Sequence, residues 1–479
     1  MSDVLKPYPA YKDSSVPWIG DVPAHWEVLP HRALFQEVND RNHPDEPLLS
    51  VTIARGVIPQ KALLTDSSKK DSSNLDKSNY KRVQPGDIAY NKMRAWQGAI
   101  GVSQYKGIVS PAYVIIRPRQ QQAPEYYHYL LRTPGFIKEA ERWSYGITSD
   151  MWSLRAEDFK RIYGVLPPPA EQRAIAAFLD HHDRLTRRYI HAQQRLIKLL
   201  TEQKQALIQQ TVTRGLDPDA PLKDSGIAWL GKIPAHWDVV AVRLRYSVEL
   251  GKMLDTKRIT GEYLVPYLRN VDVQWDRVNT HDLPEMDITL DEYPRYTLLP
   301  GDMLVCEGGE VGRSAFWNGE IALCGYQKAL HRLRPYNPAK DVPRFLYYVM
   351  YAVAKRGIFL AGGSENTIAH LTGEKLRRYR FAFPPFDEQN AIVSRLDVTV
   401  EKIDNAIARA QRQIDLIREY RTHLIADVVT GKVDVRGVVL PTDEETEAFD
   451  EVNEGFEDEV ADADDLDTEE DVDADNGYQ

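Results

Sequence analysis

LPPPAEQRAIAAFLD at residues 166–180 returns 217 residues later as FPPFDEQNAIVSRLD at residues 383–397. Each copy leads into a run without Pro or Gly. The runs end on similar phrases, QQTVTRGLD at 209–217 and ADVVTGKVD at 426–434, which are again 217 residues apart. Because the start and the end of the run repeat with one offset, the chain contains an internal duplication.

Each repeated run has the features of a long helix. Prolines precede it, acidic residues lie in its first turn, and a glycine follows its last turn, as expected at helix ends. We therefore predict long helices over residues 166–215 and 383–436. Apolar residues recur at alternating steps of three and four, which predicts a coiled-coil seam on each helix. The predicted seam residues are Leu185, Tyr189, Ala192, Leu196, Leu199, Gln203 and Ala206 in the first helix and Ile403, Ile407, Ala410, Ile414, Ile417, Arg421 and Leu424 in the second.

A second phrase is also duplicated, KDSSVPWIGDVPAHWEV at 12–28 and KDSGIAWLGKIPAHWDV at 223–239. Its Trp and Pro residues are typical of packing. No acid or thiol adjoins the histidines in sequence, so we interpret them as structural.

Two domains of mixed α/β structure are expected, over residues 1–165 (with 1–29 as repeated lead-in) and 216–382. Short β-forming segments between Gly and Pro alternate there with helical segments. Landmarks align between the copies, Pro-Gly-Asp at 85–87 with 300–302 and Arg-Pro at 117–118 with 334–335, while the residues between them differ. We predict an α+β protein with an internal pseudo-two-fold repeat, in which one scaffold carries two different surfaces.

Length and composition agree with this plan. A chain of 479 residues exceeds the size at which one core stops growing. Its apolar runs are shorter than a membrane span, and its N-terminal residues lack an apolar signal core, so we expect a cytoplasmic protein without membrane contact. The two cysteines, Cys306 and Cys324, do not make a zinc site and are expected to be buried, inert thiols on neighbouring strands.

The net charge of −11 comes from the C-terminal residues, and the rest of the chain has more Lys and Arg than Asp and Glu. Residues 443–475 contain nineteen Asp and Glu, and without them the chain has 60 Lys and Arg against 52 Asp and Glu. We interpret residues 437–479 as a disordered acidic tail, either a solvating segment or a competitor of DNA. The basic remainder suits a nucleic-acid-binding protein, although such a surplus is also common elsewhere.

Catalytic motifs are missing from the sequence. GGEVGRS at 308–314 lacks the first glycine and the lysine of a P-loop, and FPPF at 383–386 lacks the polar residue that begins the amino-methyltransferase signature. We find no dinucleotide loop, zincin motif, serine elbow or nuclease carboxylate set. The sequence therefore favours a protein without metal or cofactor of its own and without intrinsic catalysis.

Each domain has segments rich in side chains that read bases or hold phosphates. Such segments could instead be ordinary solvated loops. The candidates in the first domain are Asn91, Lys92, Arg94, Trp96, Gln97, Tyr145, Thr148, Ser149 and Trp152. Those in the second are Arg269, Asn270, Glu307, Arg313, Gln327, Lys328, Asn366, Thr367 and His370.

Two variable domains, each entered through the PAHW phrase and left through the PPxxEQ helix, resemble the specificity subunit of type I restriction-modification systems. The resemblance spans residues 1 to about 437 and includes YNKMRAWQGAIG, GIVSPAY and GGSENTIAHLTGEKL. It implies two target-recognition domains, separated by a long antiparallel two-helix coiled coil that sets the spacing of a split DNA target.

The resemblance also implies partners. Double-stranded DNA would bind the two domains. Two methyltransferase subunits would bind S-adenosylmethionine and methylate a flipped-out adenine in each half-site. Motor-nuclease subunits would use ATP and Mg²⁺. Three alternatives stay open: a subunit of another multi-subunit modification or defence system, a non-specific coiled-coil scaffold, and a self-contained enzyme.

Overall fold

Two long helices organise the chain. In this computed structural model, α5 spans Pro169–Arg214 and α9 spans Phe386–Val429. The residues of the predicted second helix before Phe386 and after Val429 are not helical, because β25 (Arg380–Phe383) and the two prolines after it precede α9, and Gly431 follows its end at positive φ. The structure describes residues 5–63, 77–119, 122–148, 151–254, 260–360 and 370–441.

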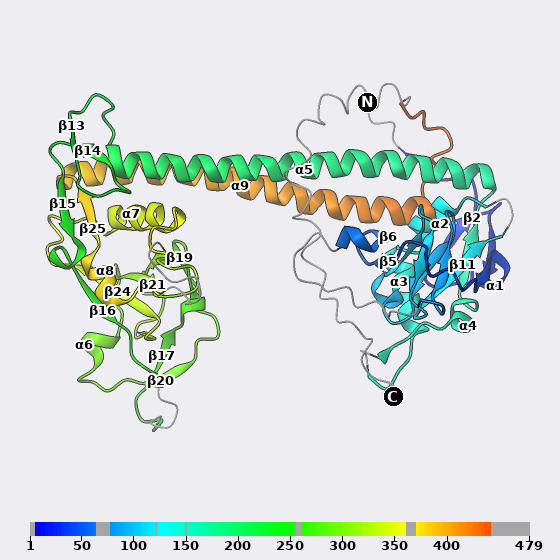
Figure 1. Cartoon of the computed structure of the whole chain (residues 1–479), viewed down its shortest axis with the longest axis horizontal. Coiled ribbons are helices and arrows are strands. Elements are labelled where there is room, and N and C mark those ends of the chain that lie inside the picture. The colour runs from blue at the N-terminus through cyan, green and yellow to red at the C-terminus, as the bar shows by residue number, and fades with distance from the viewer. Residues whose placement is uncertain are drawn as a thin grey trace. The chain divides into compact units, whose positions relative to one another are not determined.

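The chain divides into two units, one of residues 1–195 with 411–479 and the other of residues 196–410. We call them unit 1 and unit 2. Each has mixed helix and strand content (Figure 1). None of the helices within the described ranges is both long and apolar enough to cross a membrane.

Unit 1 contains a four-stranded antiparallel sheet of order β4-β11-β8-β9, in which Ile115 of β11 pairs with Val38 of β4 and Ala89 of β8. Separate ladders join β1 to β2, β3 to β12, β5 to β6 and β7 to β10. The strands are β1 (Tyr11–Asp13), β2 (Asp21–Pro23), β3 (Glu27–Pro30), β4 (Phe35–Val38), β5 (Leu49–Thr52), β6 (Gly56–Pro59), β7 (Lys81–Val83), β8 (Ile88–Asn91), β9 (Ile100–Val102), β10 (Gly107–Val109), β11 (Tyr113–Pro118) and β12 (Tyr163–Leu166). The short helices are α1 (His31–Leu34), η1 (Gln60–Leu63), η2 (Ala95–Gln97), α2 (Pro124–Leu130), α3 (Pro134–Arg142) and α4 (Ala156–Phe159).

Unit 2 repeats this plan with a sheet of order β16-β24-β21-β22 and matching ladders β13–β14 and β15–β25. Its other ladders, β17 with β20 and β23, and β18 with β19, have no counterpart of the same order among the described residues of unit 1. The strands are β13 (Leu222–Asp224), β14 (Lys232–Pro234), β15 (Asp238–Ala241), β16 (Tyr246–Leu250), β17 (Leu264–Leu268), β18 (Val273–Gln274), β19 (Arg277–Val278), β20 (Glu285–Asp287), β21 (Met303–Cys306), β22 (Ser314–Phe316), β23 (Gly325–Tyr326) and β24 (Leu330–Pro335). The short helices are η4 (Val242–Leu244), η6 (Asn270–Asp272), α6 (Tyr293–Tyr296), α7 (Pro343–Lys355) and α8 (Gly373–Arg378).

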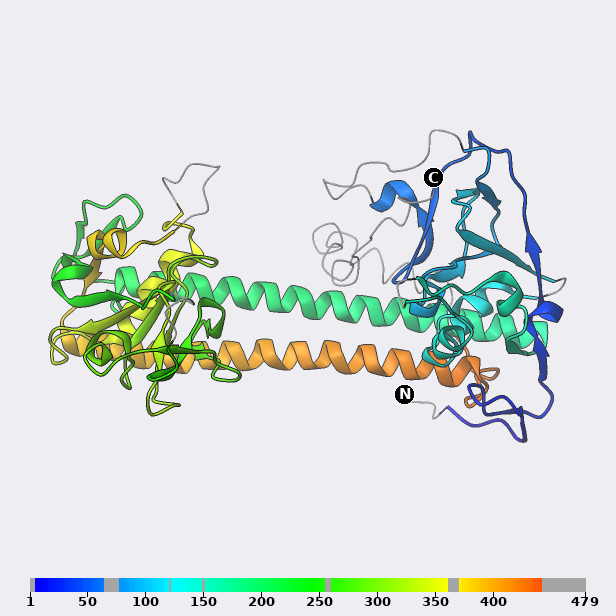
Figure 2. The ribbon, with the colours of Figure 1, turned by 90° about the horizontal axis from the view of Figure 1, so that it is seen from below.

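The core of each unit includes both long helices. In unit 1, Phe178 of α5 and Val428 of α9 belong to the cluster formed by the sheet, α2 and α3. In unit 2, Val212 of α5 and Ile392 of α9 belong to the cluster formed around α7. Within each unit the two helix segments lie side by side in both ribbon views (Figure 1, Figure 2). A folded unit therefore requires segments from both halves of the sequence.

The seam predicted for α9 is confirmed, since Ile403 and Ile414 are buried. The seam predicted for α5 is wrong, because the buried residues lie one position after the predicted ones. Leu185, which belongs to the predicted seam, is 46 % exposed, whereas Ile190 of the neighbouring stripe is 6 % exposed. Two adjacent apolar stripes with the same spacing run along α5, and spacing alone cannot show which of them faces the partner helix. The predicted seam residues of α5 that are exposed are Leu185, Tyr189, Ala192, Leu196, Leu199, Gln203 and Ala206.

The N-terminal lead-in and the segment after α9 meet in unit 1. The Asp434 backbone N–H donates to the Lys6 carbonyl at 2.8 Å, and the Tyr11 hydroxyl donates to the Lys432 carbonyl at 3.1 Å. The equivalent segment of unit 2 is one continuous stretch of chain, from Gly215 to β13. Val438 and Leu440 pack on the unit 1 core, so the first residues of the predicted tail belong to the fold, and residues 442–479 lie outside the described residues.

Candidate nucleic-acid interface

The duplicated histidine and tryptophan contact the first turn of a long helix. In unit 1, Glu171 accepts a hydrogen bond from Trp26 Nε1 at 2.9 Å and lies 2.7 Å from His25 Nε2. In unit 2, Glu388 accepts from Trp237 Nε1 at 3.1 Å and lies 2.7 Å from His236 Nε2. The acidic partner of each histidine was not evident from the duplicated phrase, because it lies about 150 residues away in the chain.

This contact is structural. A carboxylate in the first turn is favoured by the positive end of the helix dipole, and each glutamate uses its oxygens to hold the PAHW phrase against that turn. In unit 1 it also accepts from the Tyr8 hydroxyl at 3.3 Å and from Arg436 at 3.4 Å. Burial and the charge of Glu171 raise the pKa of Tyr8. The arrangement fixes the lead-in relative to the helix.

The glutamine beside each of these glutamates is fully buried and fixes a second helix. Gln172 Oε1 accepts from the Ala123 N–H at 2.8 Å, immediately before α2. Gln389 Oε1 accepts from the Val342 N–H at 2.9 Å, immediately before α7. Each Nε2 donates to a proline carbonyl ahead of the long helix, at 2.8 Å in unit 1 and 2.9 Å in unit 2. The Glu-Gln pair of the PPxxEQ phrase thus joins three segments of each unit.

The aligned Pro-Gly-Asp and Arg-Pro landmarks form an ion pair across each sheet. Arg117 donates to buried Asp87 at 2.6 and 2.9 Å. Arg334 binds buried Asp302 through the same two nitrogens, Nε and Nη2. These hydrogen bonds raise the pKa of both arginines. Bidentate pairs of this kind fix geometry as well as charge, so both sheets hold their central strands in the same relation.

The candidate residues of unit 1 come together on one side of this sheet. Asn91 ends β8, and its Oδ1 accepts from the Met93 N–H at 3.0 Å. The Trp96 and Trp152 rings pack edge to face with centroids 5.5 Å apart, which brings the YNKMRAWQG turn against the YGITSDMW segment. The Lys92 carbonyl accepts from the Leu154 N–H at 2.9 Å. Gln97, Tyr145 and Thr148 are exposed beside them, and Arg94 is partly exposed.

Positive charge accumulates at this surface. Burial, followed by the charges of Lys92 and Arg41, lowers the pKa of Lys81, whose Nζ donates to the Tyr113 carbonyl at 2.7 Å. The pKa of Lys81 falls first because burial penalises its charged form and then because Lys92 and Arg41 repel that form, and a phosphate group placed there would relieve the repulsion.

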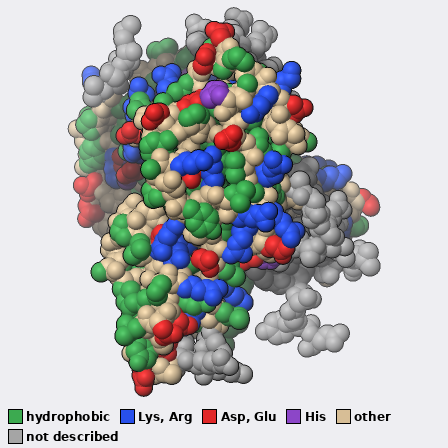
Figure 3. Space-filling view, turned by 90° about the vertical axis from the view of Figure 1, so that its left-hand side faces the viewer, with side chains coloured by type: hydrophobic (Ala, Val, Ile, Leu, Met, Phe, Trp, Pro, Cys, Tyr) green, Lys and Arg blue, Asp and Glu red, His purple; other side chains and the backbone are tan. Residues whose placement is uncertain are grey.

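The candidate residues of unit 2 also converge. The Leu371 N–H, next to exposed His370, donates to the Glu307 carbonyl at 2.8 Å. The Gln327 N–H donates to the Leu268 carbonyl at 3.0 Å, next to Arg269. The loops after β17, β21 and β23 and the residues before α8 therefore form one surface. Figure 3 shows several groups of Lys and Arg side chains on the face of unit 2 that it views.

Some candidates in unit 2 are already bound within the protein. Arg269 makes two hydrogen bonds of 2.8 Å to Asp272. Asn270 donates to the Gly308 carbonyl at 3.1 Å and accepts from Arg313 at 3.0 Å. Asn270 is therefore a positioning residue for Arg313. Lys328 and His370 are exposed.

Three candidates, Ser149, Asn366 and Thr367, lie outside the described residues. Sequence reasoning missed a repeated contact between each domain and its long helix. Tyr129 donates to Asp180 at 2.5 Å, and Tyr348 donates to Asp397 at 2.5 Å. The two aspartates end the duplicated phrases at 166–180 and 383–397, so their repetition was the available signal.

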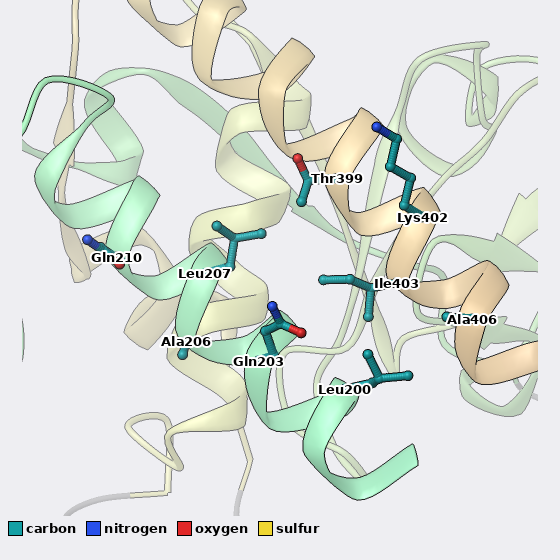
Figure 4. A pocket seen from close by; sticks show the side chains of 9 residues that line it. All are labelled: Leu200, Gln203, Ala206, Leu207, Gln210, Thr399, Lys402, Ile403 and Ala406. Carbon is teal, nitrogen blue, oxygen red and sulfur yellow. The ribbon is translucent and has the colours of Figure 1, made fainter. Parts of the chain in front are cut away.

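A groove between α5 and α9 within unit 2 has a volume of about 440 Å³. Figure 4 shows Leu200, Leu207 and Ile403 directed into it, with polar side chains such as Gln203 and Lys402 around them. Apolar side chains in an accessible groove are suited to binding another protein segment.

The two cysteines are buried and free, as expected. Cys306 is on β21, whereas Cys324 precedes β23 rather than lying within a strand. Burial raises the pKa of the Cys306 thiol to about 11 and that of the Cys324 thiol to about 12, so neither is a reactive thiolate at neutral pH. Across the ranges that the structure describes, no group of three or more His, Cys, Asp or Glu residues could hold a metal ion.

Comparison with known proteins gives consistent results. Residues 240–414 match the family model described as the type I restriction modification DNA specificity domain. A Methanocaldococcus jannaschii protein named as a type I restriction enzyme MjaX specificity subunit is 22% identical over 436 residues, covering 87% of this chain and 96% of that protein. The Escherichia coli type I restriction enzyme EcoBI specificity subunit is 24% identical over 172 residues, covering 35% and 33%.

The fold gives the same result. A chain from a solved structure concerning complex assembly and conformational transition of the type I R-M system superimposes with a TM-score of 0.66. At 16% identity, the match covers 86% of this chain and 99% of that chain. The duplicated PAHW and PPxxEQ phrases, the matching sheets that they position and these relatives make this chain similar, over most of its length, to the specificity subunits of type I restriction-modification systems.

Proposed function

We propose that this chain recognises a split, asymmetric sequence in double-stranded DNA, with unit 1 reading one half and unit 2 the other. The observation that carries the proposal is the repeated sheet with its Asp-Arg pair beneath two surfaces of different composition. Bidentate polar side chains at such surfaces discriminate base edges, while cations hold phosphates and fix orientation. The chain supplies recognition and contributes no catalytic group.

The proposal assigns a measuring role to the long helices. An α-helix rises about 1.5 Å per residue, so a helix of 46 residues is roughly 70 Å long. An antiparallel coiled coil of α5 and α9 would separate the recognition domains and determine the distance between half-sites, as the geometry of dimeric regulators does. Support comes from each unit on its own, because both cores contain a segment of each helix.

The same helices would recruit partners. Two methyltransferase subunits, which bind S-adenosylmethionine, and motor-nuclease subunits, which use ATP and Mg²⁺, complete the proposed complex. The exposed apolar stripe of α5 and the groove lined by Leu200, Leu207 and Ile403 are suitable docking surfaces. Replacing Leu200 by Asp is expected to weaken subunit assembly, while the exposed Lys402→Gln change on the groove rim lowers the charge by the same single unit and gives a charge-matched control.

An exchange experiment tests the recognition proposal. Replacing residues 30–165 by the corresponding domain of another specificity subunit should change one half of the methylated motif, which sequencing of adenine methylation in the host reveals. Deleting one heptad from both long helices at equivalent positions should change the spacing and leave the half-site sequences intact. Altered recognition of both halves after the domain exchange, or unchanged spacing in an assembled complex with shortened helices, would contradict the proposal.

Binding competition separates this function from that of a non-specific scaffold. At matched salt, a scaffold or a merely basic protein would bind motif and scrambled duplexes equally and with a steep salt dependence. Methylation or cleavage by the purified chain alone would instead establish a self-contained enzyme.

A further inference from the structure

The segment between α3 and α4 forms a narrow projection from unit 1. Tyr145 and Ser153 make an antiparallel bridge, in which the Ser153 N–H donates to the Tyr145 carbonyl at 3.2 Å. Nearer the tip, the Met151 N–H donates to the Thr148 carbonyl at 3.0 Å. Figure 1 shows this segment extending from unit 1 on the side away from α5 and α9. These bonds join residues 145–148 to residues 151–153.

The base of this loop is fixed to the sheet. Trp152 packs against Trp96 of η2, and Trp96 Nε1 donates to the Met93 carbonyl at 2.8 Å. The Arg155 guanidinium lies 4.8 Å from the centroid of the Tyr145 ring. Aromatic and cation–π contacts of this kind stabilise the position of a loop whose backbone ladder is short. The base of the projection is therefore held in a fixed position on the sheet.

The tip presents apolar side chains. Ile147 is 92 % exposed, and Met151 is 43 % exposed. An exposed isoleucine is not unusual by itself. This one lies between Tyr145 and Thr148 of an anchored projection, at whose base Arg155 lies over the Tyr145 ring and the Leu154 N–H donates to the Lys92 carbonyl. The projection thus combines an exposed apolar side chain, Ile147, with a cationic side chain at its base, Arg155.

We propose that Ile147 inserts between neighbouring base pairs of the half-site read by unit 1, with Met151 covering the opened step. This inference rests on the DNA-recognition function proposed above. Apolar side chains that enter a base step unstack it and bend the duplex, and the contacts that the bend permits offset the unstacking cost. The cations at the base of the loop hold the phosphates beside the opened step.

A consequence is specificity without a hydrogen bond to a base. Pyrimidine–purine steps open more easily than others, so a wedge favours sequences with such a step at one position. DNA is favoured as the occupant over a protein partner, because the loop adjoins the surface where the candidate base-reading residues of unit 1 converge and where Lys81, Lys92 and Arg41 concentrate positive charge.

The test uses the complete complex of this chain with its methyltransferase subunits. The probe is a duplex carrying the motif that the complex methylates in cells, with 2-aminopurine placed in turn at each step of the unit 1 half-site. The variants are Ile147→Ala, Ile147→Met and, as a matched control, Val439→Ala, since Val439 is 93 % exposed. Affinity, salt slope and 2-aminopurine fluorescence are measured for each, and subunit assembly is followed by gel filtration.

The expected result with the unaltered complex is a fluorescence increase at one step that does not contain the adenine flipped out for methylation. Ile147→Ala should abolish most of that increase and weaken motif binding about tenfold or more at an unchanged salt slope, because the lost contact is apolar. Ile147→Met should retain both properties, and Val439→Ala should behave as the unaltered chain.

Three outcomes would contradict the proposal that Ile147 inserts between base pairs. One is binding and fluorescence by Ile147→Ala equal to those of the unaltered complex. Another is an equal loss of affinity for motif and scrambled duplexes. The third is failure of subunit assembly in Ile147→Ala, which would assign the side chain to a protein contact. If the unaltered complex does not prefer the motif duplex at all, the proposed function fails as well, so the two failures are distinguishable.

Discussion

Glu171→Ala should open the lead-in of unit 1 without unfolding the rest of that unit. The carboxylate accepts from Trp26 Nε1 and Tyr8, and Trp26 is fully buried. A buried donor without an acceptor costs roughly 1–3 kcal/mol. An acidic group at a helix N-terminus contributes about 0.3–1 kcal/mol. The free energy of local opening should therefore fall by roughly 1–4 kcal/mol in total.

Hydrogen exchange with mass spectrometry on the full chain measures this opening. Peptides covering residues 18–30 should lose protection, and those covering 229–241 should not. Glu171→Gln keeps an acceptor and should lose about 1 kcal/mol at most. Glu388→Ala serves as the matched control and should open only the second peptide. Equal protection in Glu171→Ala and the unaltered chain, or a loss of protection in both peptides, would refute the anchoring role of Glu171.

Three further predictions follow from burial and connectivity. Ile190→Ala should reduce the stability of unit 1 by roughly 2–4 kcal/mol in urea unfolding, whereas Leu185→Ala should cost less than about 1 kcal/mol, and the reverse order would restore the seam expected from the sequence. Burial lowers the pKa of His31 to about 3, below its ordinary 6.5, so stability should be constant above about pH 7.5 and fall as the pH drops below about 6.5, where the unfolded chain takes up a proton; His31→Phe should weaken this dependence, and an unchanged dependence would exclude His31 as its source. A circular permutant that joins Leu440 to Leu5 through a linker, with new ends in the loop between α5 and β13, should fold and assemble, since Asp434 and Lys6 nearby already share a hydrogen bond; aggregation of this permutant would show that the covalent connection between the units is required.

The sequence predicts the long helices and the α9 seam because those features follow local rules. Pro and acidic residues begin each helix, Gly follows it, and apolar spacing marks a face. It could not predict that α5 buries the stripe containing Ile190 rather than the one containing Leu185, because both have the same period. That choice depends on the partner helix, which is far away in the chain.

At the candidate interface, too, the sequence could not predict contacts between residues that are far apart in the chain. Residue types singled out segments that the structure brings together, since Trp96 meets Trp152 in unit 1 and the loops bearing Gln327 and His370 converge in unit 2. Residue types could not show that the Asn270 side chain is hydrogen-bonded to Gly308 and Arg313. Such contacts join residues about 40 positions apart, and no local pattern encodes them.

The repeated contacts explain how one fold can carry different specificities. The connection between the first and third strands of the sheet, residues 39–87 in unit 1 and 251–302 in unit 2, contains most of the strands that the units do not share. Each connection ends at an aspartate that is buried and bound to an arginine of the central strand. Because that ion pair and the Glu-Gln pair of the long helix fix the surrounding scaffold, the connection can change in sequence and in strand order without moving the sheet. Recognition can therefore diverge in each unit independently, which is the property that a reader of two unrelated half-sites requires.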